Sequence, residues 1–123
     1  MLRTMLKSKI HLATVTETVL EYEGSIGIYR DLIAAAGLMP FEKVDVVNVN
    51  NGERFQTYVI EAQAGSGTIS LNGAAARLAV RGDRVIIMNY ALMDENEAAK
   101  VKPEILLMGD GNRIERRISP SKA

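Results

Sequence analysis

Hydrophobic and polar residues alternate, or hydrophobic residues cluster, over short stretches of the chain, which is the pattern of half-buried β-strands. These stretches are Thr4–Tyr22, Val44–Val49, Arg54–Glu61, Thr68–Leu71, Val85–Met88 and Glu104–Met108. Asn50-Asn51-Gly52 separates two of them, and Asn-Gly between β-branched runs is the strongest short signal for a hairpin. The pattern therefore predicts a mainly β fold.

Three segments between these stretches have helical character. Arg30–Ala36 reads as a short helical turn ended by Gly37, Ala74–Leu78 as a second turn, and Asp94–Lys100 as an acidic helix start. Many short strands with Gly and Asn turns predict a small closed β-barrel with short helical connectors. The basic tail, residues 114–123, is expected to be frayed.

Composition narrows the classes of function. The 123 residues predict a single domain, 1–123, and the balance of 15 basic and 15 acidic residues argues against nucleic acid as a partner. With no cysteine and His11 as the one histidine, disulfides, thiolate catalysis and metal sites are not expected. No run reaches membrane-spanning length and the N-terminus lacks a signal-peptide core, so we expect a cytoplasmic protein without membrane partners.

The dipeptide Gly24-Ser25 offers chemistry that the composition otherwise lacks. If the fold brings the Ser25 hydroxyl onto the Gly24 carbonyl, attack converts the peptide bond into an ester. Elimination across the Ser25 Cα–Cβ bond and hydrolysis of the resulting imine would leave a pyruvoyl group on a new N-terminus. Most Gly-Ser dipeptides are ordinary loops, so this pair needs support from the rest of the chain.

That support comes from a set of motifs spread along the sequence. They occur in the order Lys9-Ile10-His11, Tyr22-Glu23-Gly24-Ser25, Asn51-Gly52-Glu53-Arg54, Thr57-Tyr58 and Asn72-Gly73-Ala74-Ala75-Ala76. Together they resemble the aspartate 1-decarboxylase family, and the resemblance extends from Met1 to about Met108. No single motif is diagnostic, and the specificity lies in their combination.

The resemblance implies a double-psi β-barrel that cleaves itself between Gly24 and Ser25 into a β chain, 1–24, and an α chain, 25–123. It implies a covalent pyruvoyl cofactor derived from Ser25. This cofactor would convert L-aspartate to β-alanine and CO2 through a Schiff base, in β-alanine and pantothenate biosynthesis. The family works as a homotetramer with sites at subunit interfaces. Whether an accessory maturation protein takes part is left open.

The resemblance also suggests roles for single residues. Tyr58 resembles the proton donor, and Arg54 with Lys9 resembles the pair that binds the substrate carboxylate that is retained. A planar guanidinium suits bidentate capture of a carboxylate. The remaining residues divide between processing and substrate binding. For processing they are Tyr22, Gly24, Ser25, Thr57 and His11, and for substrate binding they are Thr57, Asn72, Gly73, Ala74 and Ala75.

Each of these residues has a plainer interpretation, and some positions depart from the family pattern. Tyr58 could be a packing tyrosine, Asn72-Gly73 an ordinary turn, and Arg54 a solvated charge. The departures are Val47 in place of an aromatic residue, Tyr29 in place of an acidic one and Arg77 in place of a histidine.

Two other functions stay open. One is a small β-barrel that never cleaves and serves as a binding or structural module. The other is a pyruvoyl decarboxylase for a different amino acid, although Arg54 and Lys9 favour a dicarboxylic substrate.

Overall fold

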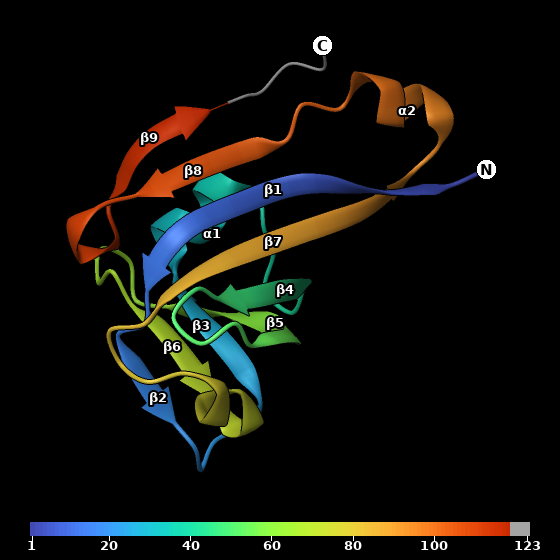
Figure 1. Ribbon diagram of the computed structural model, residues 1–123. Coiled ribbons are helices and arrows are strands. Elements are labelled where there is room, and N and C mark those ends of the chain that lie inside the picture. The colour runs from blue at the N-terminus through green and yellow to red at the C-terminus, as the bar shows by residue number, and fades with distance from the viewer. Residues whose placement is uncertain (119–123) are drawn as a thin grey trace.

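The computed structural model describes residues 1–118, which form mostly short strands, two long strands and few helices (Figure 1). In chain order the elements are β1 (Arg3–Thr14), β2 (Glu17–Val19), β3 (Ser25–Tyr29), α1 (Arg30–Ala36), β4 (Lys43–Asn48), β5 (Arg54–Ala62), β6 (Ile69–Asn72), the 3₁₀ helix η1 (Gly73–Leu78), β7 (Arg84–Met93), α2 (Glu95–Lys100), β8 (Glu104–Met108), the 3₁₀ turn η2 (Asp110–Asn112) and β9 (Ile114–Ile118).

The strands of this described part join into one mixed sheet with the order β2-β6-β3-β5-β4-β7-β1-β8-β9. The long strands β1 and β7 run antiparallel side by side, and β8 lies parallel to β1 (Figure 1). Strand β3 lies between β5, to which it is parallel, and β6, to which it is antiparallel. The sheet confirms the predicted mainly β fold with short helical connectors and is consistent with a small barrel.

One face of the sheet forms the hydrophobic core, because alternate residues of each strand point to the same side. Its largest fully buried side chains are Ile10, Ile26, Ile28, Leu32, Ile69, Leu71, Ile87 and Leu106. Burying one such side chain contributes about 1.5–3 kcal/mol. The alternate positions of β1, β4, β5 and β7 consequently point away from the core, and we call this side the outer face.

Helix α1 has the bounds that the sequence predicts. It ends because Gly37 takes the left-handed conformation, with φ of 68°. The Gly37 N–H donates to the Ala34 carbonyl and the Leu38 N–H to the Ile33 carbonyl, which is the Schellman pattern of a glycine-terminated helix. Buried Leu32 and Ile33 pack this helix on the core.

The first β stretch is shorter than predicted. Strand β1 ends at Thr14 and the three-residue β2 follows, whereas Leu20–Tyr22 lies outside any strand. A bulge at Leu12, where φ is 65°, shifts the register of β1 on β7. Beyond it, the Val15 N–H still bonds to the Asp83 carbonyl, next to β7, but the Thr16 N–H bonds to the Ile69 carbonyl, so the chain passes from β7 to β6.

The prediction of a frayed tail is wrong for Ile114–Ile118, which is strand β9 paired antiparallel with β8. Residues 119–123 of that prediction lie outside the described part. Buried Asn112 anchors the turn before β9 through bonds to the Thr14 backbone, and the Tyr29 hydroxyl donates to the Asn112 carbonyl. These contacts join residues far apart in sequence, so the composition of the tail does not reveal them.

Candidate active site

Ser25 is the first residue of β3 and is only 1% exposed. It pairs with Asn72 of β6, and a chain of hydrogen bonds fixes both side chains. The Ser70 hydroxyl donates to Asn72 Oδ1 at 2.7 Å, and Asn72 Nδ2 donates to Ser25 Oγ at 2.9 Å. Ser25 Oγ in turn donates to the Glu23 carbonyl at 3.2 Å. Because Ser70 occupies the amide oxygen, the Asn72 NH2 group is directed at Ser25.

The backbone of Gly73 packs directly against the Gly24-Ser25 step. A Cβ atom at Gly73 would lie 2.7 Å from Gly24 Cα and 2.8 Å from the Tyr22 carbonyl oxygen, and φ at Gly73 is +67°. A side chain therefore fits neither the space nor the backbone conformation. Buried Ala75 and exposed Ala74 follow in η1. We call Gly24, Ser25, Ser70, Asn72 and Gly73 the cleavage cluster.

Thr57 and Tyr58 lie on the strand next to β3. Ile26 pairs with Val59 in a parallel register, so Ser25, one residue earlier in β3, is level with Tyr58, about 4.8 Å away across the strands. Val59 points into the core, so the half-buried Tyr58 points to the outer face. Thr57 pairs with buried Val44 and points to the core side. The fold thus brings Tyr58 beside Ser25, and Thr57 is the preceding residue of the same strand.

The predicted cationic residues lie elsewhere in the same chain. Arg54 pairs with Val47, Val47 with Ile86, and Ile86 with His11, so Arg54 and His11 are three strand spacings apart, about 14 Å along the sheet. Arg54 also begins β5, about 13 Å before Tyr58 along the strand. Lys9, His11 and Arg54 all lie on the outer face, and we call the two cationic residues, Lys9 and Arg54, the cation face.

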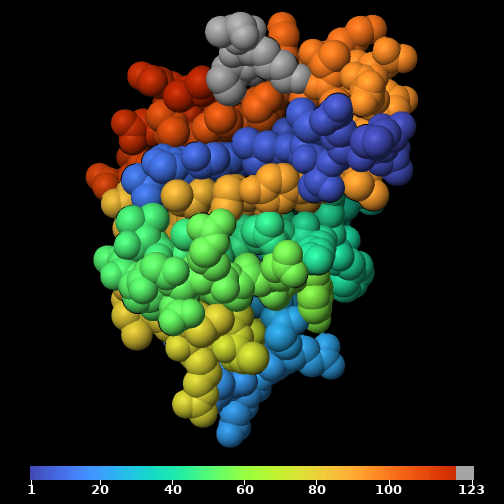
Figure 2. Space-filling model, turned by 45° about the vertical axis from the view of Figure 1, so that its right-hand side comes forward, coloured from blue at the N-terminus to red at the C-terminus, as the bar shows by residue number. Residues whose placement is uncertain are grey.

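The two groups lie in different parts of the molecule. Figure 2 shows β8, β1, β7 and the β4–β5 segment as successive bands across one side of the molecule, with the segments that include Tyr22–Gly24 and η1 at its lower end. The bands also carry half-buried apolar side chains, among them Val47, Ile86 and Met88. A pocket of about 190 Å³ beside Arg54 is lined by Val47, one of the departures from the family pattern.

His11 is in an unusual electrostatic position for a histidine. Burial lowers its pKa below the ordinary value, and the nearby charges of Lys9 and Arg84 lower this pKa further. Its Nδ1 atom is buried and has no hydrogen-bond partner among the described residues. The lowered pKa favours the uncharged form of this side chain.

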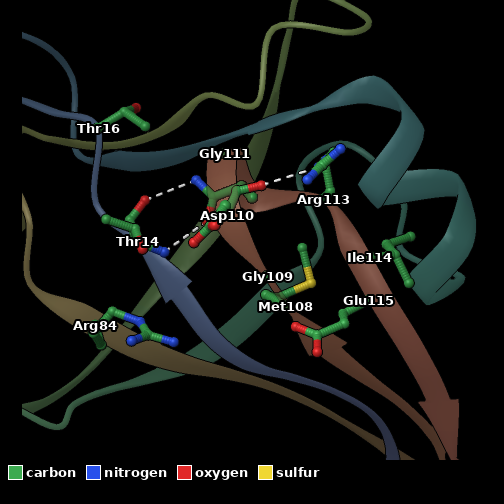
Figure 3. Close-up of a pocket in the computed structure, with 11 residues that line it drawn as sticks. Thr14, Thr16, Arg84, Met108, Gly109, Asp110, Gly111, Arg113, Ile114 and Glu115 are labelled. Atoms are coloured by element: carbon green, nitrogen blue, oxygen red, sulfur yellow. Dashed lines mark hydrogen bonds between the residues drawn. The ribbon is translucent and has the colours of Figure 1, made fainter.

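A pocket of about 690 Å³ lies around η2, and it is lined by none of the predicted site residues (Figure 3). Several of its polar groups are engaged in structural contacts: Arg84 with the Leu12 carbonyl, Arg113 with the Asp110 carbonyl, and the Thr14 backbone with Asn112. We therefore do not assign it to the candidate site.

Other kinds of site find no support within residues 1–118. No group of three or more His, Asp or Glu side chains there could hold a metal ion. No helix of this part is long and apolar enough to cross a membrane.

The structure adds one residue that sequence reasoning missed. Ser70 orients Asn72, and both lie on one strand with Ser25 as the cross-strand neighbour of Asn72. The available signal was the spacing of Ser70 and Asn72, which places two polar side chains on the same face of an otherwise apolar strand.

Comparison with known proteins gives one family. A family model described as aspartate decarboxylase matches residues 1–115. A protein of Ralstonia nicotianae named aspartate 1-decarboxylase is 59% identical over 114 residues, covering 93% of this chain and 95% of the relative. Proteins of the same name from Methylibium petroleiphilum and Bacillus subtilis are 58% and 51% identical, and they cover 92% and 100% of this chain and 94% and 97% of their own lengths.

Proposed function

The chain belongs to the aspartate decarboxylase family, and from this premise we propose how its residues act. The reaction is the α-decarboxylation of L-aspartate to β-alanine and CO2. We propose that a pyruvoyl group made from Ser25 serves as the cofactor, after the chain cleaves itself between Gly24 and Ser25. The observation that carries this proposal is the buried Ser25 hydroxyl, held by Asn72 next to a backbone contact that only glycine allows.

In the proposed cleavage, Ser25 Oγ attacks the Gly24 carbonyl carbon, the C–N bond breaks and an ester forms with a free amine on Ser25. Loss of the Ser25 Cα proton and of the Gly24 carboxylate from Cβ gives an enamine that tautomerises to an imine. Water then replaces the nitrogen, which leaves as ammonia. Thr57, which directly precedes Tyr58 on β5, would help polarise the Gly24 carbonyl, with Tyr22 and His11 as further processing residues.

The environment of Ser25 fits a pyruvoyl group. The Asn72 NH2 group is a hydrogen-bond donor aimed at this position, and the backbone of Gly73 lies directly against Gly24. Backbone N–H groups of Gly73, Ala74 and Ala75 could bind a carboxylate there. When formed, the pyruvoyl carbonyl supplies the electron sink that decarboxylation requires.

The side chains of this protein would bind substrate and move the proton. Arg54 and Lys9 hold the carboxylate that is retained, since pairing the departing carboxylate would stabilise the ground state and raise the barrier. Tyr58, level with Ser25 on the adjacent strand, returns a proton to the carbon that has lost CO2.

We further propose a homotetramer in which each site is shared by adjacent subunits. The support is the separation of the cleavage cluster from the cation face within one chain, together with the half-buried apolar residues of the outer face. A neighbour docking there would bring its Lys9 and Arg54 to Ser25. Light scattering should give a tetramer mass, and a monomer with full activity would contradict the shared site. The cytoplasmic location stays a prediction from sequence.

The experiment that tests the cofactor is intact-mass analysis of denatured protein combined with an assay of β-alanine formation. We expect fragments 1–24 and 25–123, the larger without a free amine. The Ser25→Ala protein should stay one chain and be inactive, whereas Ser66→Ala, at an exposed loop serine, should be cleaved normally. An intact wild-type chain that remains inactive after prolonged warming would favour the alternative, a barrel that never cleaves.

A further inference from the structure

The turn between α1 and β4 contains a bulky residue in a conformation that favours glycine. The Glu42 N–H donates to the Met39 carbonyl at 3.1 Å, and φ at Phe41 is +73°. This is the pattern of a type II turn, in which proline suits the second position and glycine or asparagine the third. Pro40 follows the rule, but Phe41 does not, so its backbone is strained.

Surrounding contacts hold Phe41 in this conformation. Its N–H donates to the Val59 carbonyl at 2.7 Å, and the Val59 N–H donates to the Glu42 carbonyl at 3.0 Å. The Glu42 carboxylate also accepts from the Met39 N–H and pairs with Lys7. The turn is thus attached to β5 at the residue that directly follows Tyr58.

Burial of the ring does not explain why a phenylalanine occupies this position. Phe41 is 77% exposed, so it gains little from the hydrophobic effect. Its ring does contact Tyr58: the two centroids are 6.4 Å apart and the planes are inclined by 36°, within the range of favourable aromatic pairs. The strained backbone directs the ring at the tyrosine that lies level with Ser25.

We propose that Phe41 is a positioning residue for Tyr58. Its ring packs on the tyrosine and restricts the orientations of the phenol, so that the hydroxyl stays directed at the reacting carbon. The inference rests on the proposed proton donation by Tyr58. The orientation of the Tyr58 phenol matters only after substrate has bound. Loss of the Phe41 ring should therefore lower kcat and leave KM unchanged.

The test begins with Phe41→Asn, since asparagine tolerates positive φ and has no ring. We expect a melting temperature higher by a few degrees but a kcat lower by roughly tenfold or more per cleaved subunit, with KM unchanged. Phe41→Tyr keeps a ring and should keep wild-type kcat. Met39→Asn, at a 68% exposed residue of the same turn, should leave kcat unchanged.

Two further measurements link the effect to Tyr58. In a Tyr58→Phe background, Phe41→Asn should cause no additional loss of kcat. In the uncleaved Ser25→Ala precursor, which has 4 tyrosines and no tryptophan, Phe41→Asn should alter the tyrosine band in near-ultraviolet circular dichroism.

The outcomes separate the inference from the function on which it rests. A Tyr58→Phe enzyme with full turnover defeats the proton-donor role and the inference with it. If Tyr58→Phe slows turnover but Phe41→Asn leaves kcat at the wild-type value, the inference about Phe41 is wrong, while the proton-donor role of Tyr58 stands. An equal loss from Phe41→Asn in both backgrounds also defeats it, because the effect would then not pass through Tyr58.

Discussion

The cleavage cluster and the cation face are built in opposite ways. In the cleavage cluster, Ser25 and Asn72 are buried, joined by strand pairing and hydrogen-bonded to one another. On the cation face, neither Lys9 nor Arg54 forms an ion pair with any residue in the described part of the chain, and Arg54 is exposed. Ser25, Asn72 and Ser70 are thus joined to one another within one chain, whereas the cation face has charges available for a ligand or a neighbouring subunit.

Replacing Tyr58 should separate cleavage from turnover most strongly. Tyr58→Phe keeps the ring but removes the acidic proton, so the protein should still cleave while kcat falls by roughly 10²–10⁴-fold. Intact mass reports cleavage and β-alanine formation reports turnover. A variant within about a factor of two of wild type would show that water or another group returns the proton.

A change on the cation face should affect substrate capture but not maturation. Arg54→Ala should lose a charge-assisted pair worth about 1.5–3 kcal/mol, or roughly 10- to 150-fold in kcat/KM, with normal cleavage. Arg81→Ala, at an exposed arginine in the turn before β7, is the matched control. Equal activity of the two variants would place the substrate carboxylate elsewhere.

Within the cleavage cluster, Ser70 should influence the rate of maturation. Ser70→Ala removes the donor to Asn72 Oδ1 and frees the amide to rotate, at a cost of about 0.5–1.5 kcal/mol. We expect cleavage to be roughly 2- to 10-fold slower. Intact-mass measurements taken over time would report the cleavage rate. Cleavage at the wild-type rate would show that Asn72 is oriented without Ser70.

The smallest expected effect is the pH dependence that comes from His11. Its pKa is lowered in the folded protein, first by burial, so the unfolded chain binds more protons between the folded pKa and the ordinary value of 6.5. The stability contribution is therefore present above that window and lost as the pH falls through it. His11→Asn should flatten this part of a plot of unfolding free energy against pH. An unchanged plot would contradict the assigned environment.

Local signals in the sequence predicted much of the fold. Arg30–Ala36 and Glu104–Met108 have the predicted bounds, because Gly37 ends the helix and the apolar run forms the strand. Strand β9 was missed, since its pairing with β8 and the anchoring of Asn112 depend on partners that periodicity does not identify.

The candidate site was also predictable only in part, because local sequence motifs do not identify contacts between distant strands. Gly24, Ser25 and Asn72 form a connected group, as the motifs suggested. The role of Ser70, the strained turn at Phe41 and the distance between Arg54 and Ser25 arise from strand register and backbone conformation. Motif spacing along the chain carries no information about these features.

Mixed oligomers test most directly the central claim, that the cleavage cluster of one chain works with the cation face of a neighbour. Ser25→Ala and Arg54→Ala subunits, each nearly inactive alone, are coexpressed in equal amounts and purified together. If sites are shared in a symmetric assembly, about a quarter of them combine an intact Ser25 with an intact Arg54, and activity should return to about a quarter of the wild-type value. Activity no higher than that of the Arg54→Ala subunits present would contradict the account.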